Sequence, residues 1–214
     1  MSVQGTNEWL MERLGHVTAS RFADVLKQPR SKAAREDGDL SGSAEGYMRE
    51  LMCELLTNKP ARQIESEATR HGKRWENTAR EAYMKHTGLK VEQVGFIKHP
   101  TERFVGCSPD GLTDDAGLEI KCPIDAQNHL SVLLDGVPKK HMAQIQGGMW
   151  VCGKTRWDFV SYHDDFHKDQ RLLVIQVARD EQFIDTLFRA VLAFRDEMLS
   201  RMQSLIAQWK RKAA

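Results

Sequence analysis

The sequence predicts an α/β fold in which a mixed sheet lies between helices. Helical spacing of apolar residues dominates the first ninety residues, alternation with a period of two begins near residue 91, and a long helical pattern ends the chain. The resulting order is helices, strands, helices, strands and a final helix. Neither an internal repeat nor a linker interrupts it, so we expect one domain over residues 1–214.

Size and composition restrict the class of protein. With 214 residues, 41% hydrophobic and 29% charged, the chain can bury one sizeable core and does not resemble a disordered or fibrous sequence. It contains no apolar stretch of the ~20 residues that a membrane helix needs, and its beginning lacks a signal-peptide pattern. Four cysteines without a C-x-x-C pair indicate neither a disulfide framework nor a zinc module. We therefore expect a reduced, cytoplasmic enzyme with no membrane association.

The charge is balanced overall but uneven along the chain. The net charge of +1 argues against a sequence-reading DNA-binding domain, which usually has a basic footprint. Residues 59–90 nevertheless hold eight Lys or Arg against four Glu, and the chain ends in a basic run at 210–212. Each patch alone is as consistent with a solvated helix face as with a polyanion-binding surface.

Two helices are predicted in the first quarter of the chain. Thr18 is a suitable N-cap for a short helix over 19–27, which Pro29 ends. Residues 29–42 are polar and aperiodic, so we expect a loop there. Apolar residues with helical spacing predict the second helix over 43–58.

The longest early helix is predicted over 65–87, with Gly88 as its C-terminal stop. Its small and apolar stripe leaves Glu76 at the margin, beside Trp75. A carboxylate that points partly inward needs a partner. A salt bridge to Arg80, one turn later, is the structural interpretation of Glu76.

From residue 91 onward strands and helices alternate. The predicted strands are 91–97, 103–106, 117–122, 156–162 and 172–177. The predicted helices are 125–134, 139–151 and 180–212.

The segment 107–123 (CSPDGLTDDAGLEIKCP) carries the chemistry. Alternation along its strand places Glu119 and Lys121 on one face. Asp110 ends the neighbouring strand, and the short turn 113–117 folds it back beside Glu119. Two carboxylates with nearby backbone carbonyls are the oxygen-rich ligands that Mg²⁺ prefers. Lys121 would then hold a water or a phosphate oxygen, and we expect the cation to lower its pKa.

Pro-Asp followed about ten residues later by Glu-x-Lys resembles the core of the PD-(D/E)XK nucleases. Four further blocks make the chain similar to the phage lambda-type exonucleases, the viral alkaline exonuclease or YqaJ-like recombinase family. These blocks are 9–20 (WLMERLGHVTAS), 72–80 (GKRWENTAR), 142–150 (MAQIQGGMW) and the strand at 174–180 that enters the last helix.

The resemblance implies a restriction-endonuclease-like fold and a processive, Mg²⁺-dependent exonuclease. Such an enzyme degrades the 5′-phosphorylated strand of linear double-stranded DNA in the 5′→3′ direction to mononucleotides. It leaves 3′ single-stranded tails for recombination by single-strand annealing. The resemblance further implies two Mg²⁺ ions per site, for which Mn²⁺ substitutes, a ring-shaped homotrimer around DNA, and a single-strand annealing protein as partner. It also implies a phage- or prophage-encoded protein of the host cytoplasm.

The resemblance assigns roles to single residues. Asp110, Glu119 and the backbone carbonyl of Ile120 correspond to metal ligands, Glu76 to the helix-borne acid near the second metal, and Lys121 to the catalytic lysine. The positions that hold the terminal 5′-phosphate in relatives correspond to Arg13, Ser20, Ser108 and Gln144. These types suit that role, because a guanidinium binds phosphate oxygens with two parallel hydrogen bonds and hydroxyl or amide groups add directional donors.

Two other functions remain open from the residues alone. One is an endonuclease or junction resolvase with the same core, and the other is a non-catalytic scaffold that binds DNA ends.

The family also uses an apolar side chain before the Gly72 helix turn to part the terminal base pair. The candidate stretch is 68–71, and its Thr69 is not an obvious wedge.

Several conspicuous residues have ordinary structural interpretations. His163 and His167 form an H-x₃-H pair that we interpret as a solvated turn. Cys107 and Cys122 are interpreted as small core residues. The tryptophans interpreted as core residues are Trp75, Trp150 and Trp157.

Overall fold

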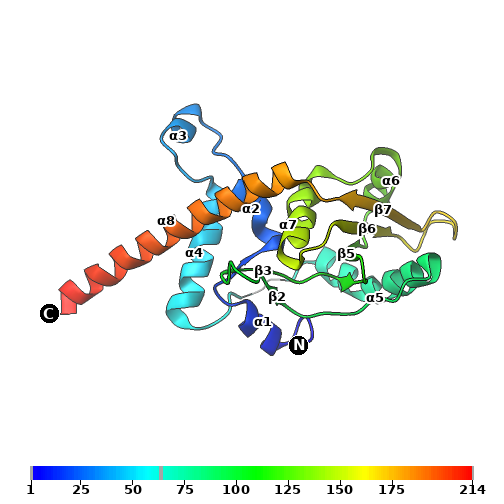
Figure 1. Ribbon diagram of the computed structural model, residues 1–214, viewed down its shortest axis with the longest axis horizontal. Helices are drawn as coiled ribbons and strands as arrows, with labels where there is room; N and C mark the ends of the chain where they lie inside the picture. Colours follow the sequence, from blue (N-terminus) through cyan, green and yellow to red (C-terminus); the bar gives the residue numbers. More distant parts are fainter. Residues whose placement is uncertain (1, 63–64, 214) are drawn as a thin grey trace.

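The computed structural model describes residues 2–62 and 65–213 and has a mixed α/β architecture with sheets flanked by helices (Figure 1). A four-stranded sheet has the order β4-β5-β6-β7, and a three-stranded sheet has the order β1-β3-β2. The strands are β1 (Val17–Thr18), β2 (Ile97–Lys98), β3 (Val105–Cys107), β4 (Gly111–Leu112), β5 (Ala116–Lys121), β6 (Arg156–Tyr162) and β7 (Leu172–Ala178).

The helices follow the predicted apolar patterns closely. Gly88 ends the longest early helix in the left-handed conformation, with φ of 72°, as a glycine C-cap does. The α-helices are α1 (Asn7–Arg13), α2 (Phe22–Leu26), α3 (Lys32–Glu36), α4 (Gly42–Thr57), α5 (Glu67–Thr87), α6 (Ala126–Asp135), α7 (Met142–Cys152) and α8 (Glu181–Ala213). Two short 3₁₀ helices, η1 (Ala19–Arg21) and η2 (Lys139–His141), precede α2 and α7.

The four-stranded sheet has helices on both faces. β5 and β6 are parallel, whereas β4 and β7 are antiparallel edge strands. Ala79 and Tyr83 of α5 pack against Leu118 and Val160 on one face. The opposite face is covered by α6 and α7. The side chains in this second layer are Val132, Ile145, Met149, Trp157 and Phe159.

Two glycines allow the close approach of α7 to this sheet. A Cβ at Gly117 of β5 would lie 2.2 Å from the ring of Trp157, and one at Gly148 of α7 would lie 2.7 Å from the same ring. Because Trp157 is buried, neither contact could be relieved by moving the indole into solvent. The spacing between the sheet and α7, which carries Gln144, therefore depends on both glycines.

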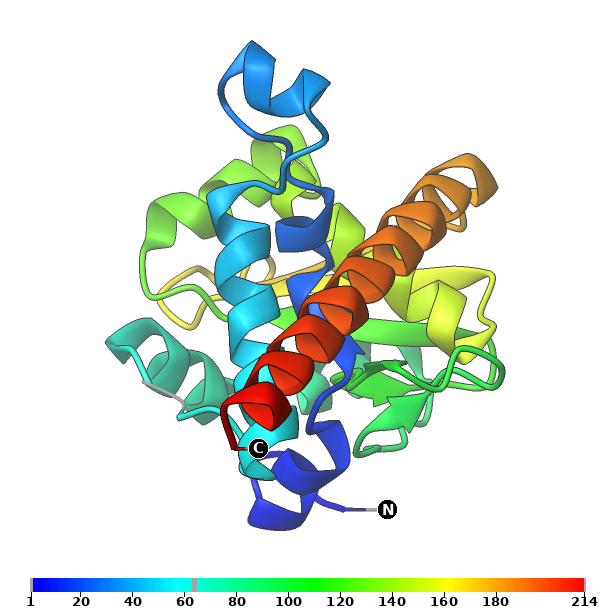
Figure 2. The ribbon, with the colours of Figure 1, turned by 90° about the vertical axis from the view of Figure 1, so that its left-hand side faces the viewer.

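A second core joins the N-terminal and C-terminal helices to the three-stranded sheet. Phe22, Tyr47 and Val105 are buried there with Leu187 and Phe194 of α8. Helix α8 crosses in front of α4 (Figure 2), and its C-terminal half extends beyond α4, away from the four-stranded sheet (Figure 1). This core includes Val17 of β1 and Ala19 of η1 and so supports the segment that carries Ser20.

The structure corrects three details of the expected fold. The strands form two sheets, because the extended stretch 91–97 makes only one isolated bridge, Glu92 to Leu112, before β2 begins at Ile97. Its Val94 and Phe96 are buried although their backbone is largely unpaired. The loop 29–42 contains the short helix α3, and the first block of the chain contains the unpredicted helix α1.

Side-chain caps account for these two short helices. The hydroxyl of Ser31 accepts from the backbone N–H of Ala34, and the hydroxyl of Thr6 accepts from that of Trp9. Thr18 occupies the expected N-cap position of η1, but its hydroxyl contacts Ser20 rather than capping the backbone. No helix within 2–62 and 65–213 is both long and apolar enough to cross a membrane.

Candidate active site

The β4–β5 hairpin brings Asp110 beside Glu119, as the sequence predicts. Asp110 directly precedes β4, and its backbone N–H donates to the carbonyl of Leu118 at 3.1 Å. Its carboxylate accepts from the backbone N–H of Ile120 at 2.6 Å. The turn is closed by Thr113 and Ala116, which are joined by a 2.8 Å backbone hydrogen bond. The hairpin therefore holds Asp110 at the middle of β5, one residue from Glu119.

Glu119 and Lys121 share a face of β5 and form an ion pair. Glu119 is almost completely buried, with 2% of its side chain exposed, whereas Lys121 is partly exposed. Gln144 of α7 donates to the second oxygen of Glu119 at 2.7 Å. Gln144, expected as a phosphate contact, therefore also orients a candidate metal ligand.

Glu76 joins the cluster from α5 through a buried arginine. Arg80, one turn later, donates to Glu76 at 2.5 Å and to the backbone carbonyl of Asp110 at 3.0 Å. The predicted salt bridge of Glu76 to Arg80 is confirmed, and it lies within the acidic cluster. The i,i+4 spacing identified the salt bridge, but no sequence signal could reveal the bond to Asp110.

The three carboxyl groups lie in a field that opposes their ionisation. Burial, assisted by the charge of Asp110, raises the pKa of Glu76. Burial also raises the pKa of Asp110 although Lys121 and the Ile120 N–H act against it. For Glu119, burial outweighs the opposing Lys121 and raises the pKa to about 7. Three acids that each resist ionisation at one place form an electrostatic site for added positive charge.

The pKa of Lys121 is shifted in the opposite direction from the one that the sequence reasoning expected. Burial acts to lower the pKa of Lys121, but the charges of Glu119 and Asp110 outweigh it and raise the pKa. The expected lowering assumed a neighbouring cation. The protein's own groups alone hold Lys121 firmly as an ammonium.

The carboxylates are turned toward protein donors rather than around one common point. Within 2–62 and 65–213, no three His, Cys, Asp or Glu side chains are arranged to hold a metal ion. Glu76 faces Arg80, Asp110 faces the Ile120 N–H, and Glu119 faces Lys121. The donor chemistry nevertheless fits a hard divalent cation, because the available atoms are carboxylate and carbonyl oxygens. Binding would require Glu76 and Glu119 to rotate away from their cationic partners.

Asp110 lines three cavities, one of which, of about 290 Å³, lies beside residues 2–4. The other two meet at Asp110 next to the acidic cluster. The larger, of about 650 Å³, lies between α5, α6 and η2, and Glu76 and Lys121 line it. Its other polar and basic lining includes Lys73, Lys140, His141 and Ser161. The smaller, of about 250 Å³, lies on the side of α1 and α7. Asp110 lines both cavities, so an extended ligand that reached from one cavity to the other would pass the acidic cluster.

The smaller cavity contains all four residues expected at the 5′-phosphate. Arg13, Ser20, Ser108 and Gln144 line it together with Asp110 and Glu119. They come from α1, η1, the turn after β3 and α7. The resemblance therefore selected residues that the fold brings together over a separation of more than 120 residues.

Trp9 is a component of this cavity that the sequence reasoning missed. Its indole N–H donates to the Ser108 hydroxyl at 3.0 Å, and the Arg13 guanidinium lies 4.2 Å from the centre of its ring. Arg13 also donates to Ser108 at 3.4 Å, and burial lowers its pKa. The i,i+4 spacing of Trp9 and Arg13 is the signal that could have found the pair.

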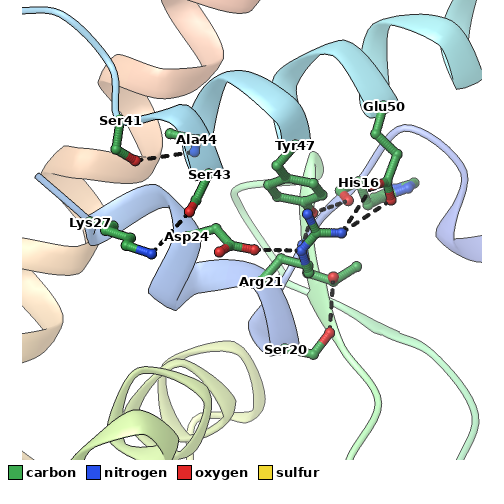
Figure 3. A network of polar contacts seen from close by, with 11 residues as sticks. His16, Ser20, Arg21, Asp24, Lys27, Ser41, Ser43, Ala44, Tyr47 and Glu50 are labelled. Atoms are coloured by element: carbon green, nitrogen blue, oxygen red, sulfur yellow. Dashed lines mark hydrogen bonds and ion pairs between the residues drawn. The ribbon is translucent and has the colours of Figure 1, made fainter. Parts of the chain in front are cut away.

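A buried polar network fixes the segment that carries Ser20 (Figure 3). The Ser20 hydroxyl is 3.3 Å from that of Thr18, whose backbone N–H donates to the Tyr47 hydroxyl at 3.0 Å. Arg21 lies 4.2 Å from the centre of the Tyr47 ring and donates to Glu50. These contacts tie η1 to α4, so Ser20 is held at the cavity by Thr18, which also lines it, and through Thr18 by Tyr47, which does not.

The structural interpretations of the other conspicuous residues agree with their surroundings except at His163. The predicted solvated turn holds for His167, which is exposed, and is wrong for His163, which is buried. Cys107 and Cys122 are buried. Trp157 is buried, and Trp75 and Trp150 are packed at the edges of the cores. The candidate wedge stretch 68–71 forms the exposed first turn of α5, which leaves the wedge without an assignment.

Comparison with known proteins supports a nuclease. The crystal structure of the alkaline exonuclease LHK-Exo from Laribacter hongkongensis superposes with a TM-score of 0.84 and 36% identity, covering 98% of this chain and 100% of that one. A complex of LHK-Exo with dAMP gives a TM-score of 0.86 at the same identity and coverage. A phage-related exonuclease from Haemophilus somnus 129PT shares the fold, with a TM-score of 0.70, 19% identity and coverage of 87% and 96%.

Sequence comparison gives the family. An uncharacterised protein, R354, of Acanthamoeba polyphaga mimivirus is 23% identical over 195 residues, which are 80% of this chain. The chain spans about a third of the length of that mimivirus protein (32%). The model of the YqaJ-like viral recombinase domain matches residues 8–155, a span that contains every residue of the acidic cluster and of the smaller cavity named above. The chain belongs to the family of YqaJ-like viral recombinase domains, related to the lambda-type alkaline exonucleases.

Proposed function

We propose that the protein is a Mg²⁺-dependent 5′→3′ exonuclease that acts on the ends of linear double-stranded DNA. The observation that carries this proposal is the position of Asp110 between two cavities, one of which holds Arg13, Ser20 and Ser108. This cavity of about 250 Å³ has room for a terminal phosphate, and its half-buried Arg13 can bind phosphate oxygens with charge-assisted hydrogen bonds. Binding of the terminal phosphate there would set the first phosphodiester beside the acids. This favours end-dependent cleavage over the endonuclease alternative.

The residues of the chain divide the work of hydrolysis. Arg13 and Ser108 hold the terminal phosphate, and Trp9 keeps Arg13 in place through the stacking contact and the hydrogen bond to Ser108. This orientation converts end binding into correct placement of the scissile bond. Lys121, kept protonated by Glu119, donates to a phosphate oxygen or to the attacking water. All these contacts go to the backbone, so cleavage does not depend on base sequence.

Divalent ions complete the site in this proposal. Asp110, Glu119, the Ile120 carbonyl and Glu76 would hold two Mg²⁺ ions, or Mn²⁺ in their place. Bound metal supplies an activated water and stabilises charge on the phosphate and on the leaving oxygen. Arg80 balances the negative charge of Glu76 when that carboxylate does not bind metal. Its hydrogen bond to the carbonyl of Asp110 holds the backbone there against α5.

The first test of the function is hydrolysis of linear duplex DNA. With Mg²⁺, 5′-phosphorylated linear duplex should release 5′-mononucleotides and retain 3′ tails, and EDTA should stop the release. Asp110→Ala and Lys121→Ala should lower the rate by at least about 10³-fold, because metal binding and charge stabilisation each contribute several kcal/mol. Asp114→Ala, which removes an exposed acid from the neighbouring turn, is the matched control and should keep wild-type activity.

Two results would contradict the proposal. Cutting of a covalently closed circle at a comparable rate would identify an endonuclease or resolvase. Lack of hydrolysis with both Mg²⁺ and Mn²⁺, combined with tight binding to duplex ends, would identify a non-catalytic scaffold.

Recognition of the 5′-phosphate is tested through Arg13. Arg13→Gln should lower the rate on 5′-phosphorylated ends by about 10- to 100-fold, because a charge-assisted hydrogen bond contributes about 1.5–3 kcal/mol. The rate on 5′-hydroxyl ends should change little. Arg189→Gln on the exposed face of α8 is the control and should alter neither rate. An equal loss on both kinds of end would show that Arg13 does not read the phosphate.

The raised pKa of Glu119 predicts a pH-dependent effect on stability. Its folded-state pKa of about 7 exceeds the ordinary value of 4.5, so the folded state binds this proton more tightly than the unfolded state does. The stabilisation from this proton is complete below pH 4.5 and is lost as the pH rises through 7. In EDTA, Glu119→Gln should therefore become relatively more stable by about 1–3 kcal/mol between pH 5 and pH 8.

Urea unfolding of both proteins at the two pH values measures this difference. Glu81→Gln, an exposed substitution on α5, controls for loss of a surface charge. If the stability difference between wild type and Glu119→Gln is the same at pH 5 and pH 8, Glu119 does not titrate near 7.

The assembly is proposed on the same family basis. Residues 1–214 would form one nuclease domain, and three such subunits would form a ring around DNA that gives processivity. A single-strand annealing protein would receive the 3′ tail in the cytoplasm of a phage-infected or prophage-carrying host. Sedimentation should give three times the monomer mass, and a tagged chain should retain the annealing protein encoded beside it. A monomer mass or no association would remove the corresponding part of this proposal.

A further inference from the structure

A buried chain of hydrogen bonds lies behind the catalytic cluster, on the sheet face that carries Lys121. Ser161 of β6 lies 2.7 Å from Nδ1 of His129, which comes from α6. Nε2 of the same ring lies 2.9 Å from the backbone carbonyl of Gln170, just before β7. Ser161 and His129 are both buried, and the ring of Phe166 packs edge-on against the imidazole with 4.7 Å between centroids. Strand β6 and the segment before β7 therefore both contact the one histidine of α6 that bonds to the Ser161 hydroxyl.

The direction of each hydrogen bond follows from the Gln170 carbonyl. A carbonyl only accepts, so Nε2 of His129 carries the proton and donates. A neutral imidazole protonated at Nε2 accepts at Nδ1. Burial lowers the pKa of His129, which favours this neutral form. The Ser161 hydroxyl therefore donates its proton to His129, and its oxygen offers only lone pairs to any other neighbour.

Lys121 is the donor that lies next to this oxygen in the sheet. Lys121 of β5 and Ser161 of β6 are register partners in the parallel pair, so their side chains leave the same face of the sheet. Both residues line the 650 Å³ cavity beside Asp110 and Glu76. An ammonium has three N–H donors, and Glu119 is the ion-pair partner of Lys121 within 2–62 and 65–213. When Glu119 turns toward a metal, the ammonium needs another acceptor to keep its position.

We propose that Ser161 is a positioning residue for Lys121 and that His129 orients it. With its proton committed to His129, the Ser161 oxygen accepts from the Lys121 ammonium and keeps that amine pointed into the larger cavity when Glu119 is drawn away. The role rests on the proposed nuclease function, in which Lys121 contacts the scissile phosphate or the water. It extends the site to α6, an element to which the PD-(D/E)XK motif assigns no residue.

Kinetics of Ser161→Ala test the proposal on the whole protein. Loss of the acceptor should lower kcat on 5′-phosphorylated duplex by about tenfold and leave KM for duplex ends unchanged, because the amine is misplaced while end binding is intact. His129→Gln should lower kcat in the same way, and the double variant should be no slower than Ser161→Ala alone. Ser41→Ala, which removes an equally buried serine hydrogen bond at the start of α4, should lower Tm but keep kcat.

A measurement that does not use activity separates this inference from the function itself. In the Glu119→Ala background, where Lys121 has lost its ion-pair partner, we expect the ¹⁵N-lysine ammonium signal of Lys121 to show hydrogen exchange that becomes severalfold faster after Ser161→Ala. If exchange and kcat are both unchanged by Ser161→Ala, or if His129→Gln and Ser161→Ala act additively on kcat, the proposal is wrong. If wild type is inactive but exchange accelerates, the nuclease assignment fails while the Ser161–Lys121 contact stands.

Discussion

Withdrawal of three carboxylates from water in one place, nearly complete for Glu119 and partial for Glu76 and Asp110, is the constraint on which the rest of the site depends. Glu76, Asp110 and Glu119 each have a raised pKa, chiefly because the surrounding protein removes them from water. Arg80 and Lys121 lie against these acids and offset their charge, and the Ile120 N–H and Gln144 donate hydrogen bonds to them. Both cations also fix geometry, since Arg80 ties α5 to the backbone at Asp110. The same two cations therefore both balance the charge of the acids and set the geometry of the cluster.

The two sheets support different parts of the candidate site. Only residues 108–110 separate β3, in the three-stranded sheet, from β4, in the four-stranded sheet. Ser108 lies at the start of this connection and faces the smaller cavity, and Asp110 lies at its end and faces both cavities. The candidate phosphate pocket is thus supported by the core that includes α4 and α8, while the acidic cluster is supported by α5 and β5. A two-residue separation therefore joins the candidate phosphate pocket to the acidic cluster.

Local sequence patterns predicted the bounds of those helices and strands whose ends or faces are set by residues close together in the sequence. The αL glycine at Gly88 ended α5 at the expected residue, and alternation of β-branched and aromatic residues located β6 with its observed bounds. The pairing of Glu119 with Lys121 followed from the period of the strand. Helix α1 was missed, because its apolar pattern spans only about two turns and depends on packing of Trp9. The expectation of a single sheet was wrong, because the strands form two sheets. The stretch around Val94 makes only the isolated bridge of Glu92 to Leu112, and such pairing depends on residues that are distant in the sequence.

The sequence by itself determined the chemical identity of the site: a Pro-Asp and Glu-x-Lys hairpin, an inward glutamate on a helix and the blocks typical of one family. Those features depend on spacing within a strand, a turn or a helix, and such short-range geometry is encoded locally. Only the tertiary structure decided that Arg80 reaches the Asp110 carbonyl, that Trp9 holds Arg13 and Ser108, and that His129 orients Ser161 beside Lys121. The hydrogen bonds among these contacts join residues that lie 30 to 99 positions apart in the sequence. Their geometry arises when separate helices pack on the sheets, and no local sequence pattern specifies that packing.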